Sequence, residues 1–515
     1  MEQLIAIGQG FAALAAPGVF LAMVGGFLIG TIFAAVPGLT GTLAIALLLP
    51  MTFSMDVTSA LVMCASIFMG GQYGGSITAI TVNIPGAPCA VMTAYEGNKL
   101  MRKGQGVGAL RAAALASMIG GVLGAGMLMA FSPFVAEMAL HVRTPGKFSL
   151  ILFAFFVIIL SSEGSLIKGI VATVFGLMIG TIGIDVASSA ARQTFGYVGL
   201  VEGVQLMAVI IGAFAISELF VQAGEGDLKL DAAKSAARAP VRDFMPRLSD
   251  FRAFGAFKYL KFAIIGHFIG VLPGAGGSSA SFISYAEARR ASKTPEAYGE
   301  GSLEAVSATE CANNAMCGGS LVPMLSFGIP GDTTAAVILG VLIINGLTPG
   351  PQLMSEQFTL VTPMMAALFV SALLIPLSLM LFGPFYLRLV TLNRGVLFST
   401  IALVAMAGAY VSTFSILQMG LALAVGIVAY MMHRSGYPIV SFLLGYLLGP
   451  DLEVYMRRSL SISNGDPSIF LTSPDSIFFL LMIVVFFYFM VLRPWLHARG
   501  TPRDDLFSDD GGPRL

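Results

Sequence analysis

Long apolar runs, separated by short polar segments, occupy most of the chain. Runs of about 20 apolar residues are long enough to cross a bilayer as helices. Because the runs are continuous rather than alternating, they predict helices, which pair their own backbone groups in lipid. The pattern therefore predicts an all-α polytopic membrane protein with about 10–12 transmembrane helices. The clearest runs are 18–36, 110–132, 165–184, 205–222, 396–413, 415–432 and 475–492, and weaker ones are 57–70, 148–161, 258–272, 333–348, 358–387 and 437–449.

Proline and glycine interrupt these runs in the same order in both halves of the chain, with an offset of 236 to 245 residues. A single break of this kind more often serves helix packing. Breaks at matching places in two halves instead indicate the binding site of a secondary transporter. We therefore expect two inverted repeats that contain broken helices or re-entrant hairpins. The motif residues are Pro37, Gly38, Gly74, Gly75, Pro85 and Gly86 in the first half, and Pro273, Gly274, Gly318, Gly319, Pro330 and Gly331 in the second.

Charge divides the chain near its middle. Residues 223–261 contain eight Lys or Arg, and such basic segments favour the cytoplasm. The loop 346–356 has no Lys or Arg, so we expect it on the outside and expect the two motif sets to face opposite ways. The predicted organisation is a first transmembrane repeat at 1–222, a cytoplasmic basic linker at 223–261, a second transmembrane repeat at 262–470, and a final helix with a cytoplasmic tail at 471–515.

Composition excludes several classes of protein. Charged residues make up 11% of the chain and the mean hydropathy is +0.86, whereas soluble proteins average about 25% charged residues. A net charge of zero gives no support to a nucleic-acid partner. The four cysteines form no CxxC pair, so we expect no disulfide framework, zinc site or other cofactor.

The broken segments carry hydroxyl and amide side chains. Backbone groups freed by a break must find partners in protein, water or substrate. With helix N-termini, such side chains can hold an anion without a buried arginine. A nearby carboxylate can hold Na⁺ or carry a proton. The predicted substrate-binding residues are Ser76, Thr78, Thr81, Asn83, Asn313, Asn314, Ser320, Ser326 and Thr333, and the predicted coupling-ion residue is Asp332.

A purely structural interpretation remains open for each of these residues. Ser and Thr in membrane helices often bond to their own backbone. Glu310 lies at the edge of the second segment, and Asp56 and Glu96 flank the first. For Asp56 and Glu96 we favour roles as loop or interface carboxylates.

Four stretches carry a resemblance to a known family, and they are PGLTGTLAIALLLP (37–50), GGQYGGSITAITVNIPGAPCAVMTAYEG (70–97), GVLPGAGGSSASFISYAEA (270–288) and GGSLVPMLSFGIPGDTTAAVILG (318–340). They resemble the large membrane subunit of the tripartite tricarboxylate transporters, the TctA type. The resemblance implies a bacterial inner-membrane importer of tricarboxylates or related carboxylates, including citrate, driven by a gradient of Na⁺ or H⁺. It also implies two partners, a periplasmic substrate-binding protein and a small four-helix membrane subunit.

Two other classes of function fit the sequence less well. An intramembrane aspartyl protease would use Asp332, but that chemistry needs a second aspartate sharing the proton, and Asp185 and Asp451 lie at the ends of predicted spans. An ion channel would require rings of identical subunits, whereas this chain has two nonidentical halves. We therefore expect a transporter and not an enzyme.

The predicted sidedness can be tested with single cysteines. In a background without native cysteines, Ser235→Cys in the linker should react with an impermeant thiol reagent from the cytoplasmic side only. Pro349→Cys should react from the opposite side only, because its loop lacks the positive charge that resists translocation. Labelling of both positions from the same side would contradict the inverted arrangement.

Overall fold

The computed structural model describes residues 2–161, 165–185, 188–224, 239–390 and 394–493. Within these ranges, nine helices are long and apolar enough to cross a membrane. A tenth span results if the bent pair Val241–Phe251 and Ala256–Val271 counts as one. The predicted class, an all-α polytopic membrane protein, is confirmed.

The described elements are helices apart from one short pair of strands, β1 and β2. The first half contains α1 (Glu2–Ala13), α2 (Pro17–Ala34), α3 (Gly41–Thr52), α4 (Val57–Val82), η1 (Pro88–Ala90), α5 (Val91–Arg102), α6 (Gly106–Leu140), α7 (Thr144–Ser161), α8 (Leu166–Gly180), β1 (Gly183–Ile184), β2 (Ala191–Arg192), η2 (Val198–Leu200), α9 (Leu206–Ile210), η3 (Ile211–Ile216) and α10 (Ser217–Ala223). The second contains η4 (Val241–Phe244), α12 (Leu248–Phe254), α13 (Ala256–Val271), α14 (Gly276–Ala291), η5 (Pro295–Ala297), α15 (Leu303–Phe327), α16 (Thr333–Ile344), α17 (Pro351–Glu356), α18 (Phe358–Leu389), α19 (Arg394–Val411), α20 (Ile416–Arg434), α21 (Ile439–Ile462), α22 (Ile469–Thr472), α23 (Pro474–Phe487) and η6 (Tyr488–Leu492).

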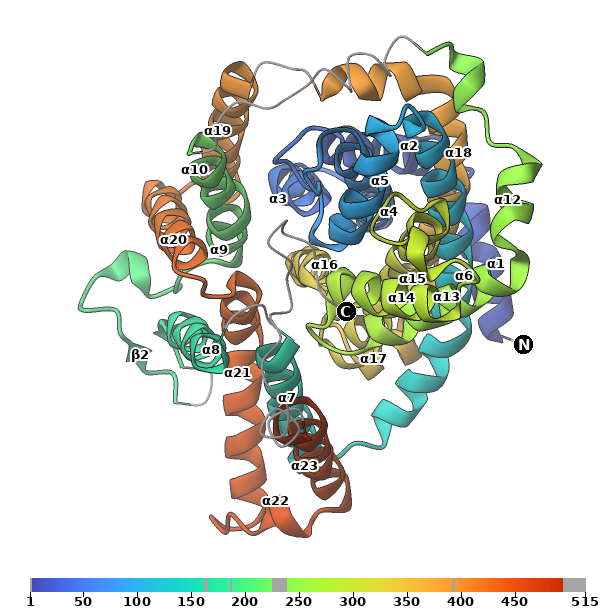
Figure 1. The fold of residues 1–515 in the computed structure, drawn as a ribbon. Helices are drawn as coiled ribbons and strands as arrows, with labels where there is room; N and C mark the ends of the chain where they lie inside the picture. The colour runs from blue at the N-terminus through green and yellow to red at the C-terminus, as the bar shows by residue number, and fades with distance from the viewer. Residues whose placement is uncertain (1, 162–164, 186–187, 225–238, 391–393, 494–515) are drawn as a thin grey trace.

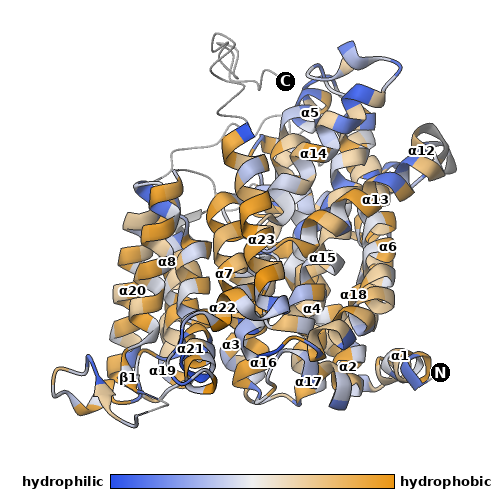
Figure 2. Ribbon diagram, turned by 90° about the horizontal axis from the view of Figure 1, so that it is seen from below, coloured by the Kyte–Doolittle hydropathy of each residue, from blue (hydrophilic) through white to orange (hydrophobic). Residues whose placement is uncertain are grey.

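The helices pack in two groups (Figure 1). One group contains α1–α6 and α12–α18, and the other contains α7–α10 and α19–α23. They meet where α3 and α16 of the first group contact η3, α19 and α21 of the second. Apolar residues cover the middle of the helices, and polar residues concentrate at the two ends of the molecule (Figure 2), as expected for helices that cross a bilayer.

Glycines allow the main helix pairs to approach closely. On α2, a Cβ added at Gly30 would lie 2.3 Å from the carbonyl oxygen of Ile67 on α4. On α13, a Cβ added at Gly266 would lie 2.1 Å from the carbonyl oxygen of Ala312 on α15. Small residues at such crossings let membrane helices pack by backbone contact. The helix before each Pro-Gly motif is therefore held in the same way in both halves.

The Gly-Gly-Ser motifs do not break their helices, contrary to our expectation. Gly74 and Gly75 lie inside α4, and Gly318 and Gly319 lie inside α15. The reason is again packing, because a Cβ added at Gly318 would lie 2.1 Å from a carbonyl oxygen of α6. The helices end further on, just before the two Ile-Pro-Gly motifs.

The equivalent helices α4 and α15 run in opposite directions. Near the end of α4, the carbonyl of Ile80 accepts a hydrogen bond from Asn98 on α5 at 3.2 Å. Glu96 of the same short helix α5 accepts hydrogen bonds from the N–H groups of Gly301 and Ser302, both at 2.9 Å, at the start of α15. Because α4 ends where α15 begins, this pair has the relation that an inverted repeat requires. Inversion of the complete halves remains a prediction.

Part of the basic linker packs on the end of the molecule where α6 begins. Arg111 on α6 forms an ion pair with Asp250 at 3.1 Å and donates to the carbonyl of Asp243 at 2.8 Å. Phe244 is buried against Gly383 on α18. Residues 225–238, which include Ser235, lie outside the described residues. The cytoplasmic location of the linker remains a prediction.

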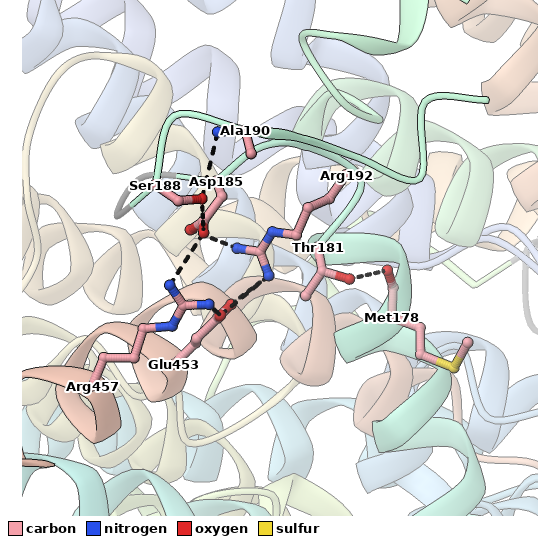
Figure 3. A network of polar contacts seen from close by, with 8 residues as sticks. All are labelled: Met178, Thr181, Asp185, Ser188, Ala190, Arg192, Glu453 and Arg457. Carbon is pink, nitrogen blue, oxygen red and sulfur yellow. Dashed lines mark hydrogen bonds and ion pairs between the residues drawn. The ribbon is translucent and has the colours of Figure 1, made fainter. Parts of the chain in front are cut away.

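A network of ion pairs fixes the loop between α8 and α9 to α21 (Figure 3). Asp185 pairs with Arg192 at 2.7 Å and with Arg457 at 3.1 Å. Glu453 pairs with the same two arginines, at 3.0 and 2.6 Å. Asp185 is thus engaged in structural ion pairs.

Two glycines on α6 provide a matched test of the close packing. A Cβ added at Gly124 would lie 2.5 Å from the carbonyl oxygen of Ala315, whereas one added at Gly126 meets nothing within 4 Å. We expect Gly124→Ala to destabilise the protein by about 1–3 kcal/mol through overpacking, and Gly126→Ala to be neutral or to stabilise it by about 0.5–1 kcal/mol. Thermal unfolding can be followed with a thiol-reactive dye, because Cys64, Cys89, Cys311 and Cys317 are free and buried. Equal unfolding midpoints for the two variants would contradict this packing.

Candidate functional site

A cavity of about 600 Å³ lies between the two groups of helices. From the first half it is lined by Thr40–Thr42 and Ala87–Cys89, and from the second half by Gly274–Ser279 and Asp332–Thr334. The second helix group adds residues of η3 and α10 and the connection between α20 and α21. A cavity of this size suits a small organic ligand.

Three helices begin at the wall of this cavity. They are α3, which starts at Gly41, α14, which starts at Gly276, and α16, which starts at Thr333. The first N–H groups of a helix have no partner within the helix and carry partial positive charge. Three such starts around one space favour an anionic ligand.

The Pro-Gly motifs turn the chain into the first two of these helices. After each proline the glycine has a positive φ, 86° at Gly38 and 74° at Gly274, a conformation that glycine adopts without strain. Thr40 then caps α3, because its hydroxyl accepts a hydrogen bond from the N–H of Leu43 at 3.0 Å. The short helices α3 and α14 therefore start at the cavity instead of continuing α2 and α13.

The Ile-Pro-Gly motifs follow a left-handed residue that ends each long helix. This residue is Asn83 after α4, with a φ of 62°, and Gly328 after α15, with a φ of 74°. Both residue types tolerate that conformation. The chain can then reverse and return along its own helix.

The returning chain makes the same hydrogen bond in both halves. The N–H of Gly86 donates to the carbonyl of Gly75, and the N–H of Gly331 donates to the carbonyl of Ser320, both at 3.2 Å. In the second half, the N–H of Gly274 also donates to the carbonyl of Gly331 at 2.9 Å. The Pro-Gly turn and the Ile-Pro-Gly turn of the second half thus form one unit, which brings Asp332 to the cavity.

The two halves meet directly at the cavity wall. The hydroxyl oxygens of Thr42 on α3 and Thr334 on α16 lie 2.7 Å apart, and either can be the donor. Both threonines line the cavity. This contact joins residues 292 positions apart in the chain.

The described residues that line the cavity include no lysine or arginine. Charge is limited to the carboxylates Asp332 and Glu218, with His433 also on the wall. Asp332 caps α16, because its carboxylate accepts a hydrogen bond from the N–H of Ala335 at 2.9 Å, and the hydroxyls of Ser320 and Thr334 face it. An anion in this cavity would therefore be held by N–H groups and hydroxyls.

Comparison with known proteins identifies the family. The model of the tripartite tricarboxylate transporter TctA family matches residues 20–444. The chain belongs to this family. It is 35% identical over 450 residues to an uncharacterised 52.8 kDa protein of Agrobacterium vitis, described as lying in the TAR-I ttuC′ 3′ region, with 87% of this chain and 88% of that protein covered. It is also 35% identical over 246 residues to an uncharacterised protein in the TAR-II ttuC′ 3′ region of the same organism, which covers 48% of this chain and 100% of that protein. No solved structure matches the chain.

The structure of this TctA-family chain brings some of the predicted site residues together. Thr333 and Asp332 line the cavity, and Ser320 faces Asp332. Ser76 and Asn313 lie behind the cavity, where both face the carboxylate of Glu310. Of the predicted motif residues, Gly274 is part of the cavity wall.

Other predicted substrate-binding residues lie elsewhere or bond to backbone. The hydroxyl of Thr78 donates to the carbonyl of Gly75 at 3.0 Å, and that of Thr81 to the carbonyl of Ile77 at 2.6 Å. Asn83 is exposed at the end of α4. Further along the second segment, Asn314 donates to the sulfur of Met69 at 3.2 Å, and Ser326 donates to the carbonyl of Ser132 at 3.4 Å.

Sequence reasoning missed several polar residues of the wall, among them Thr40, Thr42, Gln72, Ser278 and Ser279. Thr40, Thr42, Ser278 and Ser279 each lie two to five residues after the glycine of a Pro-Gly motif. That spacing places a hydroxyl at the cap or first turn of a helix, a signal that was present in both motifs. Asp56, in contrast, caps α4, and hydrogen bonds from Ser59 hold its pKa below the ordinary value.

A second cavity of about 410 Å³ touches only one of the two Ile-Pro-Gly regions. It is lined by Lys147, Gly328, Ile329 and the 346–351 loop, with Asp451 and Tyr455 opposite. The ammonium of Lys147 lies 5.7 Å from the centre of the Tyr455 ring. Because only the first cavity joins both broken segments, we take that one as the candidate site.

The contact between the two halves can be tested by a disulfide. In a background without native cysteines, Thr42→Cys with Thr334→Cys should oxidise readily, because the two side-chain oxygens lie 2.7 Å apart. Oxidation should protect both thiols from a polyethylene-glycol maleimide added after denaturation. The control pair Thr42→Cys with Thr81→Cys should stay reactive, because Thr81 points to its own helix. Equal protection of both pairs, or of neither, would contradict the placement of α3 against α16.

Proposed function

We propose that this chain is the large permease subunit of a binding-protein-dependent secondary transporter that imports tricarboxylates or related carboxylates. The observation that carries the proposal is the convergence of α3, α14 and α16 on a cavity whose described lining contains no lysine or arginine. Membership of the TctA family supports the tricarboxylate class of substrate.

Each substrate carboxylate would be bound at a helix start. The unpaired N–H groups of one start stabilise a negative charge by about 0.3–2 kcal/mol. The hydroxyls of Thr42, Ser279 and Thr333, which line the same wall, can donate further hydrogen bonds. The separate starts of α3 and α14 suit a molecule that carries several carboxylates, whereas at α16 the carboxylate of Asp332 already accepts from the N–H of Ala335. Because each interaction is modest, the substrate can also leave, as transport requires.

Import of a multivalent anion needs compensating cations. Moving one negative charge into a negative interior costs about 2.3 kcal/mol per 100 mV. Asp332 is 8% exposed in the cavity wall, and no ion pair joins it to a basic side chain in the described part of the chain. We propose it as one residue that carries the coupling cation, Na⁺ or H⁺, next to the substrate.

The proposed transporter works in the bacterial inner membrane with two partners. A periplasmic binding protein would deliver the carboxylate, and a small four-helix membrane subunit would complete the complex. The family description, which names a tripartite transporter, supports this assembly.

No structural observation favours an intramembrane protease. Asp332 contacts an N–H group and hydroxyls, and no carboxylate is among the described groups that it contacts. Asp185 is held by two arginines. Paired aspartates, which that chemistry requires, are absent from these contacts.

Two serines on α14 give a matched test of the proposed site. Ser279 lines the cavity, whereas the hydroxyl of Ser281 is buried on the same helix and is not part of the wall. Loss of one substrate hydrogen bond should cost about 1–3 kcal/mol, so Ser279→Ala should raise the half-saturating concentration for uptake roughly five- to 150-fold. Ser281→Ala should leave it unchanged.

The measurement is uptake of radiolabelled di- and tricarboxylates into vesicles that contain both membrane subunits, with the binding protein supplied outside. Omission of the binding protein should abolish uptake and serves as the control. Uptake without that protein would contradict the proposed partnership. Equal kinetics of the two serine variants would remove Ser279 from the site.

A further inference from the structure

Glu310 is completely buried on α15, behind the cavity, and the proposed substrate site does not use it. One carboxylate oxygen accepts a hydrogen bond from the hydroxyl of Thr93 at 2.5 Å, and the other from the hydroxyl of Ser117 at 3.1 Å. No lysine, arginine or histidine forms an ion pair with it in the described part of the chain. A carboxylate buried without a basic partner is costly, so its surroundings decide whether it serves the structure or a function.

Two more polar side chains complete the surroundings of this carboxylate. Ser76 and Asn313 are both fully buried and face Glu310. The hydroxyl oxygen of Ser76 and both polar atoms of the Asn313 amide lack a hydrogen bond of good geometry. Buried polar atoms without partners are rare in folded proteins and call for an explanation such as an ion.

Glu96 shows how a purely structural glutamate differs. It is also fully buried, but its oxygens accept from the N–H groups of Gly299, Gly301 and Ser302 and from the hydroxyl of Tyr285. Backbone N–H groups can only donate, so they commit that carboxylate to closing the loop before α15. The groups that surround Glu310 are hydroxyls and an amide, which can donate to a carboxylate or turn an oxygen to a cation.

We propose that Glu310, Thr93, Ser117, Ser76 and Asn313 form a Na⁺ site. The carboxylate supplies the compensating charge and two oxygen atoms. Three hydroxyl oxygens and the amide oxygen of Asn313 complete a set of hard oxygen ligands, the kind that such cations prefer. When the ion enters, each hydroxyl turns its hydrogen away from the carboxylate and presents a lone pair to the ion.

Sodium suits this site better than a proton. The other titratable groups that face Glu310 are Tyr73, Cys89 and Cys311, and each of these is uncharged in its protonated form. A proton would occupy a single carboxylate oxygen and would leave the oxygens of Asn313 and Ser76 without partners. A sodium ion engages all of them.

The Glu310 site lies next to the cavity, and the side chain of Asn313 lies between the two. Cys89, on the cavity wall, donates to Gln72 at 2.7 Å and lies beside the amide of Asn313. The amide oxygen of Asn313 would lie 3.3 Å from a Cβ placed on Gly277, which also lines the cavity. Asn313 thus separates the substrate from the ion. A role of this ion in coupling rests on the proposed function, whereas Na⁺ binding by the isolated protein does not.

Equilibrium binding of ²²Na⁺ to the purified protein tests the site, with choline replacing sodium. Wild type should bind saturably. Glu310→Gln and the isosteric Thr93→Val should each weaken binding about tenfold or more, because each removes a ligand of the ion. The control Thr173→Val removes a buried hydroxyl that donates to its own helix at 2.9 Å on α8, and it should bind like wild type.

Each variant is also measured with Asp332→Asn, so that an ion held at the cavity does not obscure the result. In that background, binding should persist with Glu310 present and vanish with Glu310→Gln. Thr93→Val provides the answer if Glu310→Gln does not fold. Wild-type affinity in Glu310→Gln or Thr93→Val, no saturable binding in wild type, or a loss equally large in Thr173→Val would overturn the site. Uptake could still proceed in each of those cases, so the proposed function would survive them.

Discussion

The structure depends on one constraint, the high cost of an unpaired backbone N–H or C=O group inside a membrane. Breaking a helix at mid-membrane frees several such groups. The chain pairs some of them by folding back, as in the hydrogen bonds from Gly86 to Gly75 and from Gly331 to Ser320. The first N–H groups of α3 and α14 instead lie at the cavity, where a carboxylate can pair them, and at α16 the chain's own Asp332 accepts from the N–H of Ala335. The same break therefore creates both the structural problem and the candidate site.

Close packing at glycines allows the chain to reverse and return along its own helix. At Gly86 and Gly331 an added Cβ would lie 2.4 and 2.2 Å from the carbonyl oxygens of Ala34 and Gly270. The returning chain therefore fits only where side chains are absent. The cavity lies at the border between two helix groups that meet through few elements. A relative movement of these groups would change the cavity without disturbing the tightly packed pairs.

The sequence was sufficient to predict the class of fold, the family and the repeated motifs. Apolar runs and Pro-Gly breaks are formed by neighbouring residues, so they can be read without knowing the packing. It predicted less of the site. Serine and threonine on α4 and α15 look alike in sequence, and only the structure shows that Thr81 bonds to its own helix while Ser76 faces Glu310. The position of Glu310, next to α5 and α6, follows from helix packing between residues about 200 positions apart, as its contact with Thr93 shows. No local pattern encodes such a contact.

We propose that helix starts from both halves hold one carboxylate substrate. The most direct test of this proposal is a structure of the complete transporter in a lipid nanodisc with substrate bound, determined by electron cryomicroscopy. We expect substrate carboxylate oxygens at hydrogen-bond distance, about 3 Å, from the first N–H groups of α3 and α14, beside the start of α16 that Asp332 caps. Substrate bound away from these helix starts, for example beside Lys147 in the second cavity, would contradict it.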